Sequence, residues 1–289
     1  MKIEPNDKYI YVTNGNLKIV LSCLGASIIE IRYSNDLLTM TPINYEDLNR
    51  EDIYYGKTIG PIANRIKDGL VVIDDNKYYL PLNEKGVCNH SGKVGLSNQM
   101  FDASIEEEKV IFFYKTHMFD GDITYKVIYS FTLNNQIRID YEVRTTNKTV
   151  ISLTNHTFFT LGESCVDNLS IDINVDQYIE SDKETLLPLS IKPYTKDINL
   201  NGGSYDSCFL LKDKRVILES TKYQLIIESN YPCAQIYTDN FEDGVLVKNT
   251  NLKTRRAVAI EPEDNLLEKT LVNKDEIYHR YIVYSFTLK

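Results

Sequence analysis

Two side chains that could transfer protons stand on stretches rich in β-forming residues. His156 lies in the middle of residues 151–161, and Glu261 closes residues 257–261. An imidazole and a carboxylate can both hold working protonation states near neutral pH, so this pair suits general acid–base catalysis. Each residue alone also fits an ordinary structural role, as a buried histidine held by a backbone carbonyl or as a strand-end carboxylate in solvent.

Three more side chains could bind a ligand beside such a pair. His90 lies within the loop-like run Asn-His-Ser-Gly, Arg65 follows an asparagine, and Asp206 lies within Ser-Tyr-Asp-Ser. Individually, these residues fit surface turns or a structural arginine. Together, two histidines, an arginine and two carboxylates on loops and strand ends are what a sugar-binding acid/base site needs.

Other chemistries find weaker support. Two histidines and a carboxylate could bind a metal, but the His-x-His pair of a cupin-like strand is missing, and His117 and His279 lie in unrelated contexts. Ser164 lacks the Gly-x-Ser-x-Gly elbow of a serine hydrolase. Neither a Walker-type loop nor a Gly-x-Gly-x-x-Gly fingerprint occurs.

Strand alternation predicts how the elements orient the pair. If residues 151–161 form one strand, His156 shares the more polar face with Ser152, Thr154, Phe158 and Thr160. In the second stretch, Glu261 shares a face with the small residues Ala257 and Ala259, which leave space before the carboxylate. We expect Pro262 to end that strand.

The rest of the chain reads as many short strands. An Asn-Gly turn at 14–15 predicts a hairpin, residues 44–52 suit one short helix, and residues 83–102 form a long loop of the kind that often carries function. Long strands at 123–133 and 136–146 are expected to join through a turn at 134–135. With no convincing helix of three turns and no repeat, the sequence predicts an all-β fold, with residues 1–289 as one large antiparallel β-sandwich domain.

Composition narrows the partners. The net charge of −9 disfavours nucleic acid and anionic membranes, which need concentrated cationic surface, so a neutral small molecule fits better. The five scattered cysteines form no Cys-x-x-Cys motif, and no run approaches a membrane span or a signal-peptide core. We therefore expect a soluble cytoplasmic protein without disulfides.

The motifs, taken in order, resemble those of the aldose 1-epimerases, or galactose mutarotases. Residues 60–66 (Gly-Pro-Ile-Ala-Asn-Arg-Ile) are similar to the family's Gly-Arg-Tyr-Ala-Asn-Arg-Ile, and residues 89–92 to its Leu-His-Gly-Gly loop. The most specific match is residues 153–159, Leu-Thr-Asn-His-Thr-Phe-Phe, against Leu-Thr-Asn-His-Ser-Tyr-Phe. Tyr205-Asp206, residues 235–238 (Gln-Ile-Tyr-Thr) and residues 260–262 (Ile-Glu-Pro) follow in the family's order.

The resemblance implies a galactose mutarotase-like supersandwich and a cofactor-independent isomerase that interconverts the α and β anomers of a free hexose. It assigns Glu261 as general base and His156 as general acid, with neither metal nor organic cofactor. It also implies that the substrate is bound by His90, Arg65, Asn64, Asp206 and Gln235. The partner is a small aldose sugar, with neither nucleic acid nor membrane, and the protein is a monomer or homodimer.

Several departures mark a divergent, short bacterial-type branch. Pro61-Ile62 replaces Arg-Tyr, Ser91 replaces a glycine, and Ser207-Cys208 replaces His-Asn, which leaves the sugar specificity open. Two alternatives remain: a hexose-6-phosphate 1-epimerase, which needs cations at the C6 end of the sugar such as Lys67 or Lys93, and a non-catalytic sugar-binding or sensor protein of the same fold.

Overall fold

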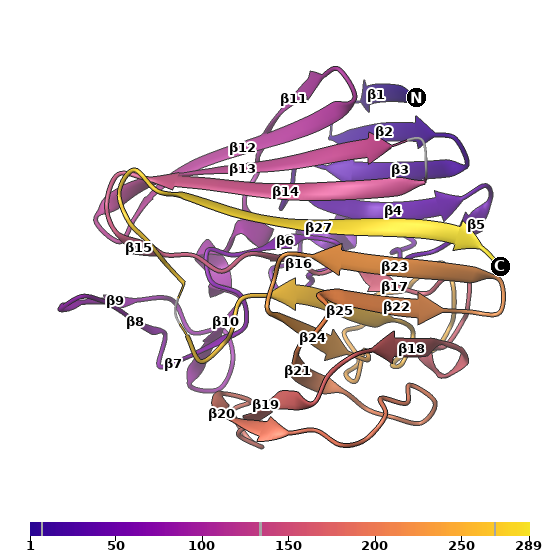
Figure 1. Cartoon of the computed structure of the whole chain (residues 1–289). Helices are drawn as coiled ribbons and strands as arrows, with labels where there is room; N and C mark the ends of the chain where they lie inside the picture. Colours follow the sequence, from indigo (N-terminus) through magenta and orange to yellow (C-terminus); the bar gives the residue numbers. More distant parts are fainter. Residues whose placement is uncertain (7, 133–134, 269) are drawn as a thin grey trace.

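The computed structural model describes residues 1–6, 8–132, 135–268 and 270–289, and antiparallel strands dominate it (Figure 1). The largest sheet has eight strands in the order β11-β12-β13-β14-β27-β23-β22-β18. Their bounds are β11 (Asp102–Glu106), β12 (Lys109–Met118), β13 (Gly121–Thr132), β14 (Gln136–Thr145), β27 (Ile277–Leu288), β23 (Tyr223–Ser229), β22 (Arg215–Glu219) and β18 (Ser170–Ile173).

A six-stranded sheet carries much of the candidate site. Its order is β17-β25-β24-β21-β19-β20. The strands are β17 (Phe158–Phe159), β25 (Val258–Glu263), β24 (Cys233–Tyr237), β21 (Asp206–Leu210), β19 (Gln177–Ser181) and β20 (Pro188–Pro193).

The N-terminal part of the chain forms a five-stranded sheet in sequence order. Its strands are β1 (Lys2–Asn6), β2 (Tyr9–Asn14), β3 (Leu17–Ser22), β4 (Ser27–Tyr33) and β5 (Asp36–Leu37). The expected hairpin is confirmed: Asn14 pairs with Leu17 across a turn in which Gly15 has a φ of 61°, a conformation that favours glycine.

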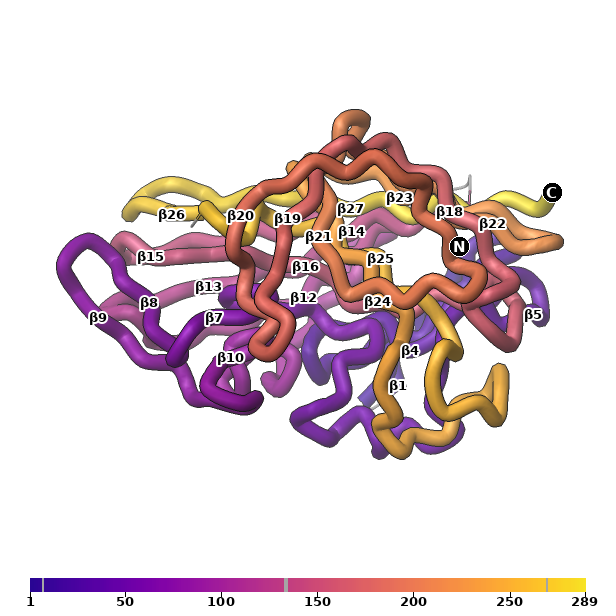
Figure 2. Tube along the Cα trace, turned by 90° about the horizontal axis from the view of Figure 1, so that it is seen from below, coloured from indigo at the N-terminus to yellow at the C-terminus, as the bar shows by residue number. Residues whose placement is uncertain are grey.

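Two-stranded pairs and short 3₁₀ helices make up the other regular elements of the described residues. The two-stranded pairs are β6 (Thr58–Ile59) with β16 (Thr154–Asn155), β7 (Arg65–Lys67) with β10 (Val87–Asn89), β8 (Leu70–Ile73) with β9 (Asn76–Tyr79), and β15 (Thr149–Val150) with β26 (Leu271–Val272). In Figures 1 and 2 the β8–β9 hairpin projects from one end of the molecule, away from the C-terminus. The 3₁₀ helices are η1 (Tyr45–Asn49), η2 (Gly92–Val94), η3 (Leu96–Asn98) and η4 (Val166–Asn168).

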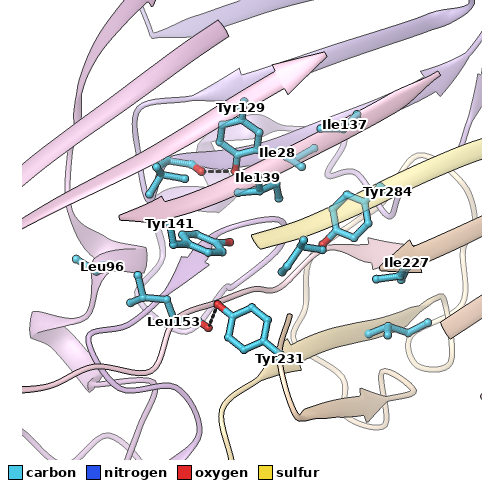
Figure 3. Close-up of a cluster of buried hydrophobic side chains, with 14 of the residues drawn as sticks. Ile28, Leu96, Tyr129, Ile137, Ile139, Tyr141, Leu153, Ile227, Tyr231 and Tyr284 are labelled. Carbon is cyan, nitrogen blue, oxygen red and sulfur yellow. Dashed lines mark hydrogen bonds between the residues drawn. The ribbon is translucent and has the colours of Figure 1, made fainter. Parts of the chain in front are cut away.

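Buried tyrosines connect the apolar core to the strand that leads to His156 (Figure 3). The Tyr231 hydroxyl donates to the Leu153 carbonyl at 2.7 Å, and the Leu153 N–H donates to the Tyr278 hydroxyl at 3.1 Å. Because a buried backbone polar group without a partner costs free energy, these bonds fix Leu153 inside the core. The residues just before His156 are therefore held from both sides.

The all-β class and the short helix at 44–52 are confirmed, but two local expectations are wrong. Residues 151–161 are not one strand: β16 ends at Asn155 and β17 begins at Phe158, with His156 in the interruption. Pro262 does not end its strand, since β25 continues to Glu263 opposite Cys233. The proline is tolerated because β17, on the other side of β25, pairs only with Val258 and Ala259, so no ladder is lost there.

The long hairpin expected around residue 134 is confirmed in its strands. β13 pairs with β14 from Ile123 to Thr132. Residues 133–134, and with them the first half of the expected turn, lie outside the described residues. Among the residues that are described, no helix is long and apolar enough to cross a membrane.

Candidate active site

His156 is placed by the backbone of a distant segment. Its N–H donates to the Lys57 carbonyl at 3.0 Å, and its carbonyl accepts from the Gly56 N–H at 2.9 Å. These bonds extend the short β16–β6 pairing, in which Asn155 lies opposite Thr58. The imidazole is buried, with 6% of the residue exposed.

Glu261 is placed by the register of β25. It lies opposite Gln235 of β24, and the next pair on the same face of these strands is Tyr237 with Ala259. The predicted alternation is confirmed, because Val258 and Ile260 belong to the main core while the Glu261 side chain lines a pocket on the other face. Only 3% of Glu261 is exposed.

The two candidate proton carriers meet across this pocket. Nε2 of His156 lies 3.4 Å from Oε1 of Glu261. Burial lowers the pKa of His156 to about 4, and burial together with Glu263 and Asp206 raises the pKa of Glu261 well above its ordinary value. Both shifts disfavour the charged form of the residue, so this environment favours a neutral imidazole beside a carboxylic acid.

His90 has its tautomer fixed by Asn64. The Asn64 N–H donates to Nδ1 of His90 at 3.2 Å, and the His90 N–H donates to the Asn64 carbonyl at 3.1 Å. Burial and the neighbouring His156 and Arg65 lower the pKa of His90 well below its usual range. With Nδ1 accepting, a neutral His90 carries its proton on Nε2 and is a hydrogen-bond donor there.

Arg65 and Asp206 belong to one row of side chains that is joined by hydrogen bonds and one longer ion pair. The Arg65 Nε–H donates to Glu84 Oε2 at 2.9 Å, and Nη2 of Arg65 lies 3.8 Å from Asp206 Oδ2. Gln235 Nε2 donates to Asp206 Oδ1 at 2.5 Å. Burial raises the pKa of Asp206, against the lowering effects of Arg65 and Gln235.

All seven residues named from the sequence line a single pocket. The cavity measures about 210 Å³. A molecule of monosaccharide size would fill it and reach into its mouth. It contains Asn64, Arg65, His90, His156, Asp206, Gln235 and Glu261. Lys67 lines a different groove, and Lys93 is absent from the described lining of this pocket.

The sequence reasoning missed the aromatic wall of the pocket. Tyr54 stacks on His156 with ring centroids 5.8 Å apart and meets His90 edge to face at 4.8 Å. Phe158 packs on His156 at 4.9 Å. Tyr237 and the exposed Phe241 also line the pocket. Apart from Phe158 and Tyr237 within the quoted motifs, no sequence signal marked these rings.

The loop at residues 83–102 was expected to carry function, but Asn83 and Glu84, whose side chains hold this loop against the pocket, were not predicted as site residues. Asn83 accepts from the Asn89 N–H at 2.7 Å and donates to the Asn89 carbonyl at 3.1 Å. It also donates to the Tyr54 hydroxyl at 3.3 Å. Glu84 accepts from the Asn89 side-chain amide at 2.8 Å. These contacts place Tyr54 and His90 relative to each other.

A second buried carboxyl, Glu263, lies on the same strand face as Glu261. It is 1% exposed, and one of its oxygens, Oε1, has no hydrogen-bond partner. Burial raises its pKa to about 8, although Cys208 and Asn64 favour its ionised form. When it is ionised, Glu263 repels a negative charge on Glu261 and so helps to raise the pKa of Glu261.

Together, the fold and the pocket define a large antiparallel β-sandwich protein with a buried imidazole–carboxylate pair facing a polar cavity. The chain belongs to the aldose 1-epimerase family, whose family model matches residues 8–285.

Known relatives agree with this membership. The chain is 28% identical to galactose mutarotase of Mus musculus over 67% of its own length and 64% of the relative. It is 26% identical to bifunctional protein GAL10 of Pachysolen tannophilus over 94% of its own length and 46% of the relative. The chain thus spans about half to two thirds of the length of these curated relatives.

Solved structures share the fold at low identity. The GalM/aldose epimerase homologue from C. elegans superposes with a TM-score of 0.88 at 22% identity, covering 97% of this chain and 98% of that one. Galactose 1-epimerase from Lactobacillus acidophilus NCFM gives a TM-score of 0.86 at 21% identity, covering 100% and 98%. The expected galactose mutarotase-like sandwich is confirmed.

Proposed function

We propose that this protein is a cofactor-independent aldose 1-epimerase that interconverts the α and β anomers of a free hexose. The observation that carries the proposal is the 3.4 Å approach of His156 Nε2 to Glu261 Oε1 at the wall of a small polar cavity. Family membership and the mutarotase names of the relatives support the same reaction. The proposal treats residues 1–289 as one catalytic domain and places the reaction in the cytoplasm.

The pair carries one transferable proton, and its position defines two states. Transfer of that proton from Glu261 to His156 creates a carboxylate and an imidazolium together, which are the base and the acid that ring opening requires. Glu261 then takes the proton of the C1 hydroxyl, while His156 gives its proton to the ring oxygen. The bond between C1 and the ring oxygen breaks, and a C1 carbonyl forms.

Ring opening returns the pair to its uncharged form. The products are the open-chain aldehyde, a protonated Glu261 and a neutral His156, which is the state that burial favours. Rotation about C1–C2 exposes the other carbonyl face. Reclosure then reverses both roles: Glu261 protonates the new C1 oxygen, and His156 takes the proton of the attacking hydroxyl.

The remaining residues bind and orient the sugar in this proposal. His90 presents Nε2–H, and Arg65 presents the guanidinium edge that Glu84 leaves open. Asn64, Asp206 and Gln235 are hydroxyl ligands. Such positioning contributes to rate because the reacting atoms must be held in near-attack geometry.

The two alternatives are less well supported. A non-catalytic binder does not need a titrating pair in contact, whereas His156 and Glu261 are both present and adjacent. A hexose-6-phosphate 1-epimerase needs unpaired cations, and the described pocket lining offers only Arg65, which is already bound to Glu84.

Optical rotation tests the proposal directly. Freshly dissolved α-D-glucose and α-D-galactose are followed with the wild-type protein and with His156→Ala. We expect decay faster than in buffer with the wild type and a loss of that acceleration in the variant. A wild-type protein that accelerates neither sugar would contradict the proposal.

A further inference from the structure

Glu84 uses both carboxylate oxygens on residues of the pocket wall. Oε2 accepts from the Arg65 Nε–H at 2.9 Å, and Oε1 accepts from the Asn89 side chain at 2.8 Å. The Glu84 backbone is fixed as well, since it exchanges hydrogen bonds with Val87 in both directions at 3.3 Å. The register of β7 with β10, which places Arg65 opposite Asn89, brings the two partners within reach of one carboxylate.

This carboxylate neutralises the single arginine in the described lining of the pocket. The lining has no lysine among the described residues, and both of its histidines are held neutral by burial. The other carboxylates of the lining are Asp52, Asp206, Asp239, Asp243 and Glu261. Carboxylates therefore outnumber cations even when the partners Arg50 and Arg256 are included.

A neutral sugar and a sugar phosphate experience this arrangement differently. A hexose needs donors and acceptors, which the row from Asn89 through Glu84, Arg65 and Asp206 supplies. A phosphate dianion needs an unpaired cation, preferably a guanidinium that can bind it through two N–H groups. Here the Nε edge of Arg65 is occupied by Glu84, and the like charge of Glu84 repels a second anion.

We propose that Glu84 is a specificity-determining residue, which positions Arg65 for uncharged aldoses and excludes phosphorylated ones by occupying and neutralising its guanidinium. The inference rests on the proposed function, because it names the substrate class of the same pocket. It assigns a selective role to a residue outside the acid–base pair. It also predicts that selectivity against phosphate depends on one removable charge.

Glutamine at position 84 separates charge from shape. Glu84→Gln keeps the length of the side chain and one oxygen that can accept from Arg65 or Asn89, but removes the negative charge. Glu84→Asp keeps the charge and moves it by one methylene. A matched control is Glu142→Gln on β14, which changes the net charge equally but lies opposite Lys126 on the large sheet, away from the pocket.

Magnetisation exchange between α and β anomeric protons measures the catalysed rate at equilibrium for D-glucose and D-glucose 6-phosphate alike. We expect Glu84→Gln to raise the ratio of kcat/KM for the phosphate ester over the free sugar by at least about threefold at low salt. The increase should shrink as ionic strength rises from about 20 to about 500 mM. Glu84→Asp and Glu142→Gln should keep the wild-type ratio.

Calorimetric binding of the two sugars separates failure of this inference from failure of the proposed function. If the wild type binds without accelerating exchange, the epimerase proposal falls and the ratio of dissociation constants still decides the role of Glu84. An unchanged ratio in Glu84→Gln, or an equal increase in Glu142→Gln, overturns the inference. A wild-type protein that prefers the phosphate ester overturns it too, and a protein that binds neither sugar overturns both proposals.

Discussion

His156 Nε2 lies 3.4 Å from Glu261 Oε1, and the two side chains come from segments more than a hundred residues apart. Neither residue is more than 6% exposed, so the ionisation of one directly affects the other. Burial pushes their pKa values in opposite directions, towards the two uncharged forms. The pair therefore titrates as a unit, and substitution of either member disables both proton transfers.

Glu261→Gln tests the base. The amide has the shape of the carboxylic acid but cannot take the proton of the C1 hydroxyl, so we expect a loss of kcat of roughly 10³-fold or more, within the range of one general-base step. The fold should persist, because the amide matches in shape and in charge the carboxylic acid that burial already favours at this position. Polarimetry measures the rate, and a circular-dichroism melt measures the fold. Near-wild-type turnover in this variant would remove Glu261 from the mechanism.

The pH profile tests the coupling of the pair. With the pKa of His156 lowered to about 4, a second proton binds the pair only in strong acid, so the acidic limb of kcat/KM should lie near pH 4. The alkaline limb should lie well above the ordinary range of a carboxyl, because the pKa of Glu261 is raised. Spontaneous mutarotation at each pH is subtracted. An acidic limb between pH 6 and 7, the range of an ordinary histidine, would contradict a buried neutral imidazole.

Arg256 anchors the loop that carries Phe241 over the pocket. The buried guanidinium donates to Asp239 at 2.7 and 2.8 Å and to Asp243 at 2.8 Å, while Asp243 also accepts from the Tyr55 hydroxyl. Arg256→Met leaves the buried Asp239 and the half-buried Asp243 without their guanidinium partner, so we expect a loss of about 3–5 kcal/mol in the free energy of unfolding.

Chemical denaturation measures this change. The matched control is Arg144→Met on the exposed face of β14, which should stay within about 0.5 kcal/mol of the wild type. Equal effects of the two substitutions would show that the Asp239–Arg256–Asp243 network contributes no specific stability.

The faces of β25 were predictable because its residues differ in polarity and size. Val258 and Ile260 could only suit a core, and the small Ala259 beside Glu261 marked the opposite face. The stretch around His156 was not predictable in the same way. Its polar residues Thr154, Asn155 and Thr157 are all buried, so alternation in polarity does not report which face meets solvent.

Contacts between distant segments explain the features that the sequence did not predict. The strand is interrupted near His156 because the chain changes its pairing partner there: β16 pairs with β6, whereas β17 pairs with β25. No local sequence pattern reveals this change. Five of the seven pocket residues were singled out by residue type and position, and the motifs in a shared order added Asn64 and Gln235. Glu84 and Tyr54 were missed because their importance arises from tertiary contacts with Arg65, His90 and His156. A single sequence shows which residue types are present, whereas the pairing of strands decides which of these residues come into contact.

The raised pKa of Glu263 leads us to expect that the free energy of unfolding falls as pH rises. Its pKa is about 8 in the folded state, against an ordinary value of 4.5, so the folded protein holds the extra proton between these pH values. Stability from this group is therefore complete below about pH 4.5 and is lost as pH rises to about 8. Relative to the wild type, Glu263→Gln should gain about 1–3 kcal/mol between pH 4.5 and 8. Denaturation at both pH values measures the gain, and the exposed Glu228→Gln should show none.

The lowered pKa of Lys57 leads us to expect the opposite effect at higher pH, where the free energy of unfolding should rise with pH. It is 1% exposed, its ammonium donates to the Arg50 carbonyl at 3.4 Å, and burial lowers its pKa from 10.5 to about 8. The unfolded chain binds more protons between these values, so the cost of burying the charge is complete below about pH 8 and disappears as pH rises to about 10.5. Lys57→Met should therefore stabilise the protein by about 1–3 kcal/mol at pH 7, with a smaller difference at pH 10. Denaturation at both pH values measures these differences, and the exposed Lys18→Met is the control. A Lys57→Met variant that is less stable than the wild type at pH 7 would show that the native protein stabilises this ammonium.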